Sequence, residues 1–171
     1  TAQAALAVGA GLVTLAGEHE ALKEHSAQVT AIMLREESDD IDSRVQAAAI
    51  GPGAGLSTQT RDRVLRLLRH GLSLVIDADA LSVFEAQPAE LFEHLHDRVV
   101  LTPHEGEFAR IFPAIDLADR LTSARLAAEV SGAVILLKGP ETVVAAPDGR
   151  LAINRHASPW LATAGSGDIL T

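Results

Sequence analysis

Short apolar segments that run directly into polar or glycine-rich turns recur along this chain, and they constrain its fold most. Residues 47–50, 72–76 and 134–137 are such segments, and each is followed at once by Gly-Pro, Asp or Lys-Gly. Continuous apolar runs of this length are typical of buried strands in a parallel sheet, with helical stretches between them. The pattern predicts an α/β fold built from successive strand–helix units.

The C-terminal third adds a different signal. Residues 143–146 and 151–153 are short β-prone runs separated by a turn that contains Asp148-Gly149, which predicts a β-hairpin. A hairpin at a sheet edge would supply antiparallel strands. With no internal repeat and no linker, we expect one domain over residues 1–171, with a mostly parallel central sheet and this hairpin near its C-terminal end.

Two further groups of elements follow from periodicity and capping. Ser57 or Thr58 is expected to cap a helix whose apolar face holds Val64, Leu65, Leu67 and Leu68. Residues 117–131 are expected to form an amphipathic helix with Leu121, Leu126 and Val130 directed inward. Nearer the N-terminus we expect a helix over residues 1–9 and strands over residues 12–16 and 29–34.

Composition narrows the class of partner. Hydrophobic residues make up 47% of the 171 residues but aromatic residues only 3%, so the core must be aliphatic. The net charge of −9 and the lack of a basic cluster argue against a nucleic-acid surface. The sequence has no cysteine, no apolar run of about 18 residues and no recognisable signal peptide. We therefore expect a cytoplasmic protein that does not bind membranes.

Four turns are expected to meet at one edge of the sheet, because the carboxyl ends of parallel strands lie together there. They cover residues 51–55, 77–79, 102–107 and 138–142. The turn 51–55 also has a purely structural interpretation as a tight turn between strand and helix. The acidic turn 77–79 is suited to orienting water or a hydrated Mg²⁺, and Asp79 is equally suited to capping a helix.

Within these turns, two side chains have chemistry of their own. Lys138 follows a strand directly and is placed to reach a phosphate as a point charge. His104 lies at a strand exit, where contact with a substrate is favoured over zinc binding because no second histidine lies nearby.

The closing stretch Gly165-Ser166-Gly167-Asp168 is typical of a glycine-rich turn that opens into a helix. Free backbone N–H groups at such a helix start bind anions. A carboxylate repels phosphate, so Asp168 suggests a base that takes a proton from an attacking hydroxyl. The structural alternative is a helix start capped by Ser166 or Asp168.

Taken in order, these motifs resemble the ADP/ATP-dependent NAD(P)H-hydrate dehydratase family of the ribokinase-like superfamily. The resemblance covers essentially the whole chain and rests on the following segments: Gly9-Ala10-Gly11-Leu12-Val13, Gly51-Pro52-Gly53, Asp77-Ala78-Asp79-Ala80-Leu81, Thr102-Pro103-His104 with Gly106-Glu107, Lys138-Gly139 with Thr142, and Ala162-Thr163-Ala164-Gly165-Ser166-Gly167-Asp168. It implies a three-layer αβα ribokinase-like (Rossmann-like) fold.

The resemblance also implies an activity. Such an enzyme repairs NADH or NADPH hydrated on the nicotinamide ring, by phosphorylating the hydroxyl and releasing phosphate. Bacterial members use ADP and form AMP, whereas animal and fungal members use ATP. Mg²⁺ would accompany the nucleotide, and the family suggests a homotetramer. Two alternatives stay open: a ribokinase-like kinase of a vitamin-precursor alcohol, and a non-catalytic adenine-nucleotide-binding subunit.

By motif position, the resemblance implies a role for each site residue. Gly53, His104 and Asp168 would contact the hydrated dinucleotide, with Asp168 as the base. The adenine nucleotide would be held by Lys138, Gly139, Pro140, Glu141, Thr142, Gly165, Ser166 and Gly167. The chain departs from the family at Glu105, where proline is common. Family members also extend beyond both ends, so we expect a fragment that lacks an N-terminal strand segment and C-terminal helices.

Overall fold

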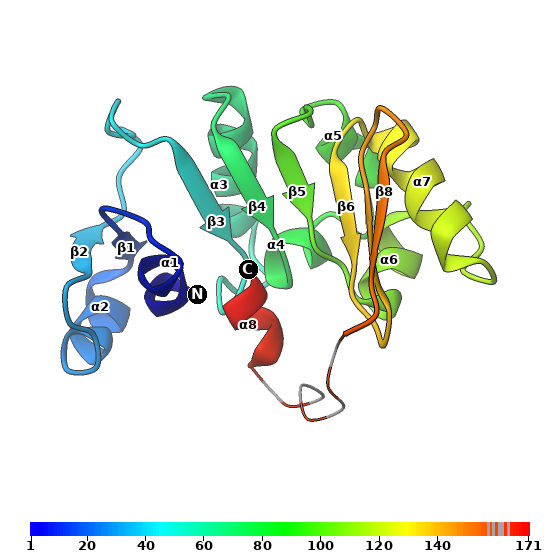
Figure 1. Cartoon of the computed structure of the whole chain (residues 1–171). Coiled ribbons are helices and arrows are strands. Elements are labelled where there is room, and N and C mark those ends of the chain that lie inside the picture. The colour runs from blue at the N-terminus through cyan, green and yellow to red at the C-terminus, as the bar shows by residue number, and fades with distance from the viewer. Residues whose placement is uncertain (157, 159, 161–162, 164) are drawn as a thin grey trace. The chain divides into compact units, whose positions relative to one another are not determined.

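The computed structural model describes residues 1–156, 158, 160, 163 and 165–171. The chain forms two compact units (Figure 1). The first comprises Thr1–Val45 with Gly165–Leu170, and the second comprises Gln46–Ala164 with Thr171. None of the helices in the described residues is long and apolar enough to cross a membrane.

The first unit is small. Its elements are α1 (Ala2–Ala7), β1 (Thr14–Gly17), α2 (His19–Ser26), β2 (Met33–Glu36) and α8 (Ser166–Leu170). Strands β1 and β2 pair in parallel, with Thr14 opposite Met33. Both strands begin later than predicted from the sequence. The predicted strand residues at 12–13 and 29–32 precede the paired segments, because hydrophobicity alone does not mark where the ladder starts.

The second unit contains a six-stranded sheet in the order β3-β4-β5-β6-β7-β8. Its strands are β3 (Ala47–Ile50), β4 (Ser73–Ile76), β5 (Val99–Leu101), β6 (Val134–Leu137), β7 (Thr142–Ala145) and β8 (Leu151–Asn154). Strands β3 to β6 are parallel, and β7 and β8 are antiparallel to their neighbours. The predicted α/β class, mostly parallel sheet and edge hairpin are confirmed.

Helices connect these strands, and Figure 1 shows α3, α5, α6 and α7 behind the sheet. The helices of this unit are α3 (Thr58–Arg69), α4 (Asp79–Ser82), α5 (Pro88–Phe92), α6 (Glu105–Ile111) and α7 (Arg120–Ser131). Helix α3 begins as predicted, because the Ser57 side chain accepts a hydrogen bond from the Thr60 backbone N–H. Gly132, in the left-handed conformation with φ +69°, ends α7.

Burial alternates along the strands. In β4, Leu74 and Ile76 are fully buried whereas Val75 is half-buried, and β5, β6 and β7 repeat this pattern. The buried side chains join those of the helices in one aliphatic core. The helices thus bury one side of the central strands β4 to β7, and this packing fixes the ends of the strands where the candidate site lies.

The prediction that the larger apolar side chains of α7 point into the core is wrong. Leu121, Leu126 and Val130 are exposed by 38%, 41% and 62%. The buried residues of this helix are the small ones: Ser123, Ala124, Ala127, Ala128 and Ser131. Small side chains let a helix backbone approach the sheet closely, so the packing follows the alanine face rather than the larger apolar side chains.

Candidate functional site

The turns that follow β3, β4, β5 and β6 lie side by side at the carboxyl edge of the six-stranded sheet. Backbone hydrogen bonds continue past the strand ends: Asp77 N–H donates to Ile50 O at 3.1 Å, and Lys138 N–H donates to Pro103 O at 2.9 Å. Each turn is therefore anchored to its neighbour. The structure brings together the four turns predicted to meet there.

The first turn approaches the second very closely. Gly51 has φ +141°, and a Cβ atom on it would lie 1.8 Å from the carbonyl oxygen of Asp77. Glycine is thus required both for its conformation and for space. Two residues further on, Gly53 has φ +70° and open space around it, and Gly55 N–H donates to Asp79 Oδ2 at 2.8 Å. Gly53 therefore presents bare backbone at the edge.

A buried cluster of charges lies behind these turns. Lys138 Nζ is 2.7 Å from Asp77 Oδ1 and 3.9 Å from Glu107 Oε2. The side chains of Asp77 and Glu107 are only 2% and 7% exposed. In this arrangement the ammonium group of Lys138, predicted to reach a phosphate, is held by two carboxylates. The cluster carries one positive and two negative charges.

The turn that contains His104 is a capping box at the start of α6. His104 Nδ1 accepts hydrogen bonds from the N–H groups of Gly106 (2.9 Å) and Glu107 (3.2 Å), and Glu107 Oε2 accepts one from His104 N–H (2.8 Å). Because Nδ1 acts as an acceptor, the ring proton lies on Nε2. The exposed ring of His104 is thereby fixed, and its Nε2 lies 3.4 Å from the second carboxylate oxygen of Glu107, Oε1.

Gly106 explains the spacing of this motif. A Cβ atom at that position would lie 2.9 Å from His104 Cε1 and 3.2 Å from Nδ1. The glycine leaves room for the ring, and the following glutamate closes the box. The His-x-Gly-Glu motif, predicted only as a substrate contact, is therefore also a rigid helix start.

The closing motif lies in the first unit. Gly165 has φ +86° and precedes α8, a helix of five residues that contains Asp168 in its first turn. The side chain of Asp168 is exposed, and its carbonyl oxygen accepts a hydrogen bond from Thr1 Oγ1 at 2.6 Å. The predicted glycine-rich turn and helix start are confirmed. Ala162 and Ala164 of the same motif lie outside the described residues, and the roles of Gly165 to Asp168 stay predictions.

Comparison with known proteins identifies the family. A family model described as NAD(P)H-hydrate dehydratase matches residues 1–171. The chain belongs to this family. It is 48% identical over 128 residues to the bifunctional NAD(P)H-hydrate repair enzyme Nnr of Gloeobacter violaceus, and the matched segment makes up 74% of this chain and 25% of that protein. It is 37% identical over 169 residues to the Nnr enzyme of Mycobacterium tuberculosis, and the matched segment makes up 98% of this chain and 35% of that protein.

Solved structures of dehydratase-family and ribokinase-like proteins share the fold. The ADP/ATP-dependent NAD(P)H-hydrate dehydratase of Bacillus subtilis, co-crystallised with ATP/Mg²⁺, matches with a TM-score of 0.82 and 26% identity, over 98% of this chain and 62% of that chain. A ribokinase-like superfamily protein of Enterococcus faecalis matches with a TM-score of 0.83 at 23% identity, over 99% of this chain and 61% of that chain. The predicted ribokinase-like fold is confirmed. The chain spans about a quarter to a third of the length of the curated relatives above.

One residue of this dehydratase-family chain was not found by sequence reasoning. Arg120, the first residue of α7, contacts the 138–142 turn and also pairs with Glu105. These partners are 15 to 21 positions away along the chain. No local motif marks such a contact, so only the folded arrangement reveals it.

Proposed function

We propose that this chain carries the nucleotide-dependent dehydratase activity that converts the S form of hydrated NADH and NADPH back to NAD(P)H. The observation that carries the proposal is the family match over residues 1–171. The gathering of four motif turns at one sheet edge supports it, because open α/β sheets bind ligands there. The substrate, NAD(P)H hydrate, and the nucleotide, ADP or ATP, are those of the repair enzymes and dehydratase to which the chain is similar.

The proposed reaction has two steps. In the first, the carboxylate of Asp168 takes the proton of the ring hydroxyl while the oxygen attacks the terminal phosphorus of ADP. The bond from that phosphorus to the bridging oxygen breaks, and AMP leaves. In the second, the carbon–oxygen bond breaks and phosphate leaves with the electron pair. A proton is lost from the neighbouring ring carbon, which restores the double bond of NAD(P)H.

The other residues act by binding and orienting. We assign Gly53 and His104 to the hydrated dinucleotide, because Gly53 is bare backbone and the ring of His104 is held in place by the capping box with its side chain half exposed. We assign Lys138, Gly139, Pro140, Glu141 and Thr142 to the adenine nucleotide. The amides of Gly165, Ser166 and Gly167 would stabilise the charge of the transferring phosphoryl group.

Mg²⁺ fits this proposal as a companion of the nucleotide. In the part of the chain that the structure describes, no group of three or more His, Asp or Glu side chains could hold a metal ion. Mg²⁺ commonly keeps several waters and binds through substrate phosphates with one or two carboxylates. Asp79, in the turn that follows β4, is an acidic residue of the edge that lies outside the buried cluster of Lys138. The ion would neutralise phosphate charge.

The activity is tested by incubating the full-length protein with S-hydrated NADH, Mg²⁺ and either ADP or ATP. We expect NADH absorbance to return, with AMP and phosphate formed in equal amounts when ADP is the donor. If NADH absorbance returns neither with ADP nor with ATP, the proposal is refuted. A stable phosphorylated product from a vitamin-precursor alcohol would instead indicate the kinase alternative. Light scattering of the same sample tests the proposed homotetramer.

The role of Asp168 is tested by Asp168→Asn. This change removes the base without changing the size of the side chain, so turnover should fall by about a hundredfold or more while nucleotide affinity is retained. Asp148→Asn, at an exposed aspartate of the hairpin turn, is the matched control and should leave turnover unchanged. Equal turnover in Asp168→Asn and the control would rule out the assignment.

A further inference from the structure

Arg120 occupies a position that helix stability does not explain. It is the first residue of α7, directly after the N-cap Asp119. The helix dipole favours acidic side chains at this end and disfavours a cation. In addition, the Nε atom of Arg120 is buried and has no hydrogen-bond partner among the described residues. A buried donor left unpaired is costly, so the reason for this arginine must lie in what the rest of its side chain contacts.

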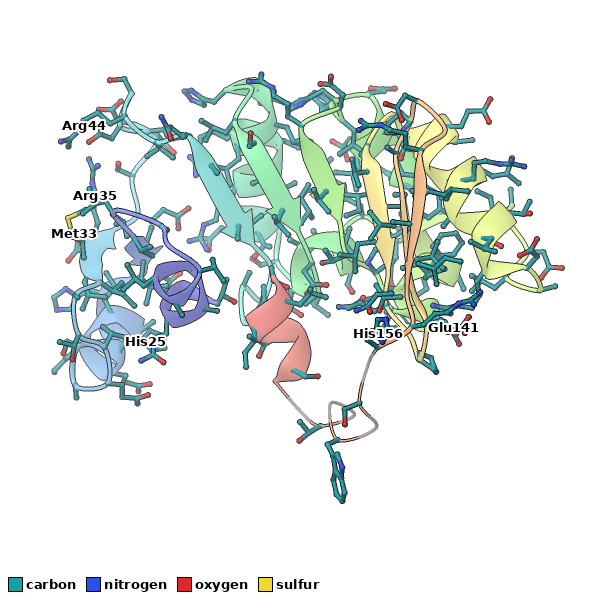
Figure 2. The ribbon with its side chains drawn as sticks, in the orientation of Figure 1. His25, Met33, Arg35, Arg44, Glu141 and His156 are labelled. Carbon is teal, nitrogen blue, oxygen red and sulfur yellow. The ribbon has the colours of Figure 1, made fainter. Side chains whose placement is uncertain are left out.

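Those contacts span the turn between β6 and β7. Arg120 Nη2 lies within hydrogen-bonding distance of three carbonyl oxygens, at 3.2 Å from Leu137 O, 3.0 Å from Lys138 O and 3.4 Å from Glu141 O. These carbonyls lie at the two ends of the segment assigned to the nucleotide. In Figure 2, Glu141 lies at the end of the sheet where this turn is found. A single guanidinium group thus closes the turn from one side.

The other half of the guanidinium reaches a second turn. Arg120 Nη1 forms an ion pair with Glu105 Oε1. Glu105 is the first residue of α6 and directly follows His104, which is assigned to the hydrated dinucleotide. Arg120 therefore contacts both the 138–142 turn and the turn that contains His104.

Gly139 provides an independent sign of the same fit. A Cβ atom there would lie 2.4 Å from Arg120 Nη2 and 2.9 Å from Cζ. The backbone of Gly139 lies outside the positive-φ region, so its conformation does not require glycine. What the glycine provides is room for the guanidinium against the turn.

We propose that Arg120 is a positioning residue for nucleotide binding. Its guanidinium holds the 138–142 turn in the shape that receives the nucleotide, and through Glu105 it ties that turn to the His104 turn. The inference rests on the proposed function for the identity of the ligand. A planar guanidinium with five donors in a fixed fork can bond carbonyls of one turn and a carboxylate of another, whereas the ammonium group of lysine is a compact charge with three donors and lacks this span.

The test uses four forms of the full-length protein: wild type, Arg120→Ala, Gly139→Ala and the double variant. Calorimetry with ADP and Mg²⁺ should give a Kd about tenfold weaker for each single variant, because the turn must then be ordered on binding. In the Arg120→Ala variant the guanidinium no longer occupies the space beside Gly139, so adding Gly139→Ala should weaken the Kd by less than about twofold more. The KM for the nucleotide should rise with Kd, and kcat should change less.

A second readout does not depend on any ligand. Hydrogen exchange of the 137–143 backbone should be faster in Arg120→Ala, and faster to a smaller extent in Glu105→Gln, although Glu105 has no hydrogen bond to that segment in the structure. Arg125→Ala, at an exposed arginine of the same helix, is the matched control and should change neither exchange nor Kd. The conservative Arg120→Lys should not restore either quantity.

The possible results distinguish the positioning role of Arg120 from the proposed nucleotide-dependent activity. Additive effects of Gly139→Ala and Arg120→Ala would mean that Gly139 acts on the nucleotide directly, and would overturn the fit between them. Unchanged exchange in Arg120→Ala would overturn the positioning role. If the wild type binds neither ADP nor ATP, the proposed function and the nucleotide part of this inference fall together, while the exchange data still decide whether Arg120 holds the turn.

Discussion

Asp77→Asn tests how much the buried charge cluster stabilises the carboxyl edge of the sheet. The carboxylate of Asp77 is 2% exposed, lies 2.7 Å from Lys138 Nζ, and also accepts a hydrogen bond from the Thr171 hydroxyl. Asparagine keeps the shape and one acceptor oxygen but removes the charge. The change therefore isolates the ionic part of the contact.

The magnitude follows from the distances. With an effective dielectric constant near 20, a contact of 2.7 Å has a gross attraction of about 6 kcal/mol, and the 3.9 Å contact with Glu107, which remains, about 4 kcal/mol. Removing the charge of Asp77 also removes the cost of burying it, which offsets much of the lost attraction. Lys138 is 20% exposed, so water compensates part of the rest. We expect a net destabilisation of about 2 kcal/mol.

Native-state hydrogen exchange measures this value locally. The opening free energy of the β4 and β6 backbones should fall by about 2 kcal/mol in Asp77→Asn. The matched control is Asp148→Asn, whose Oδ2 lies at the same 2.7 Å from Arg150 Nε but in an exposed turn. Exposed pairs contribute about 0–1 kcal/mol, so the control should differ little from wild type. Equal losses in the two variants would refute the argument that burial strengthens the Asp77 contact.

Three further predictions concern single positions of the second unit. Gly51→Ala should destabilise it by about 3 kcal/mol or more, measured by thermal unfolding, because the added Cβ would lie 1.8 Å from a backbone oxygen and φ is +141°. Gly106→Ala should displace the His104 ring, weaken the capping box by about 1 kcal/mol and raise the KM for the hydrated dinucleotide. The pKa of Asp119 is lowered, chiefly by the hydrogen bond from the Thr122 hydroxyl. The stability that ionised Asp119 gives to the start of α7 should therefore be complete above about pH 4 and lost as pH falls through the lowered pKa. Hydrogen exchange in α7 should show this pH dependence, and Asp119→Asn should remove it.

The sequence predicts this fold best where a local signal and the packing agree. The β3–turn–α3 unit is an example: a short apolar run, an obligatory glycine and the Ser57 cap each act over a few residues. The failure at α7 has the opposite cause. Leucine and valine at helical spacing indicate a buried face, but the sheet accepts the Ala124, Ala127 and Ala128 face instead. Side-chain hydrophobicity does not encode how closely a helix must approach its neighbour.

The candidate site also has features that the sequence predicts and features that it does not. Turns at strand ends are predictable, because parallel topology alone brings them to one edge. The partner of each charge is not predictable. Lys138 follows a strand and suggests a phosphate ligand, yet its ammonium group is paired with Asp77, 61 positions away along the chain. Arg120 lies in no motif at all. Such contacts depend on which turns become neighbours, and that is settled by the order of strands in the sheet.

Glu107 shows why a motif match leaves the role of a residue undecided. Its Oε2 accepts the His104 N–H at 2.8 Å and lies 3.9 Å from Lys138 Nζ, so one buried carboxylate links the histidine turn to the nucleotide turn. Arg120 links the same two turns from the exposed side through Glu105. Two bridges between two turns make their geometry over-determined, which would suit the proposed phosphoryl transfer between two bound ligands. Under the proposed function, the buried Glu107 would orient the site through these contacts, while the exposed Asp168 would act as the base.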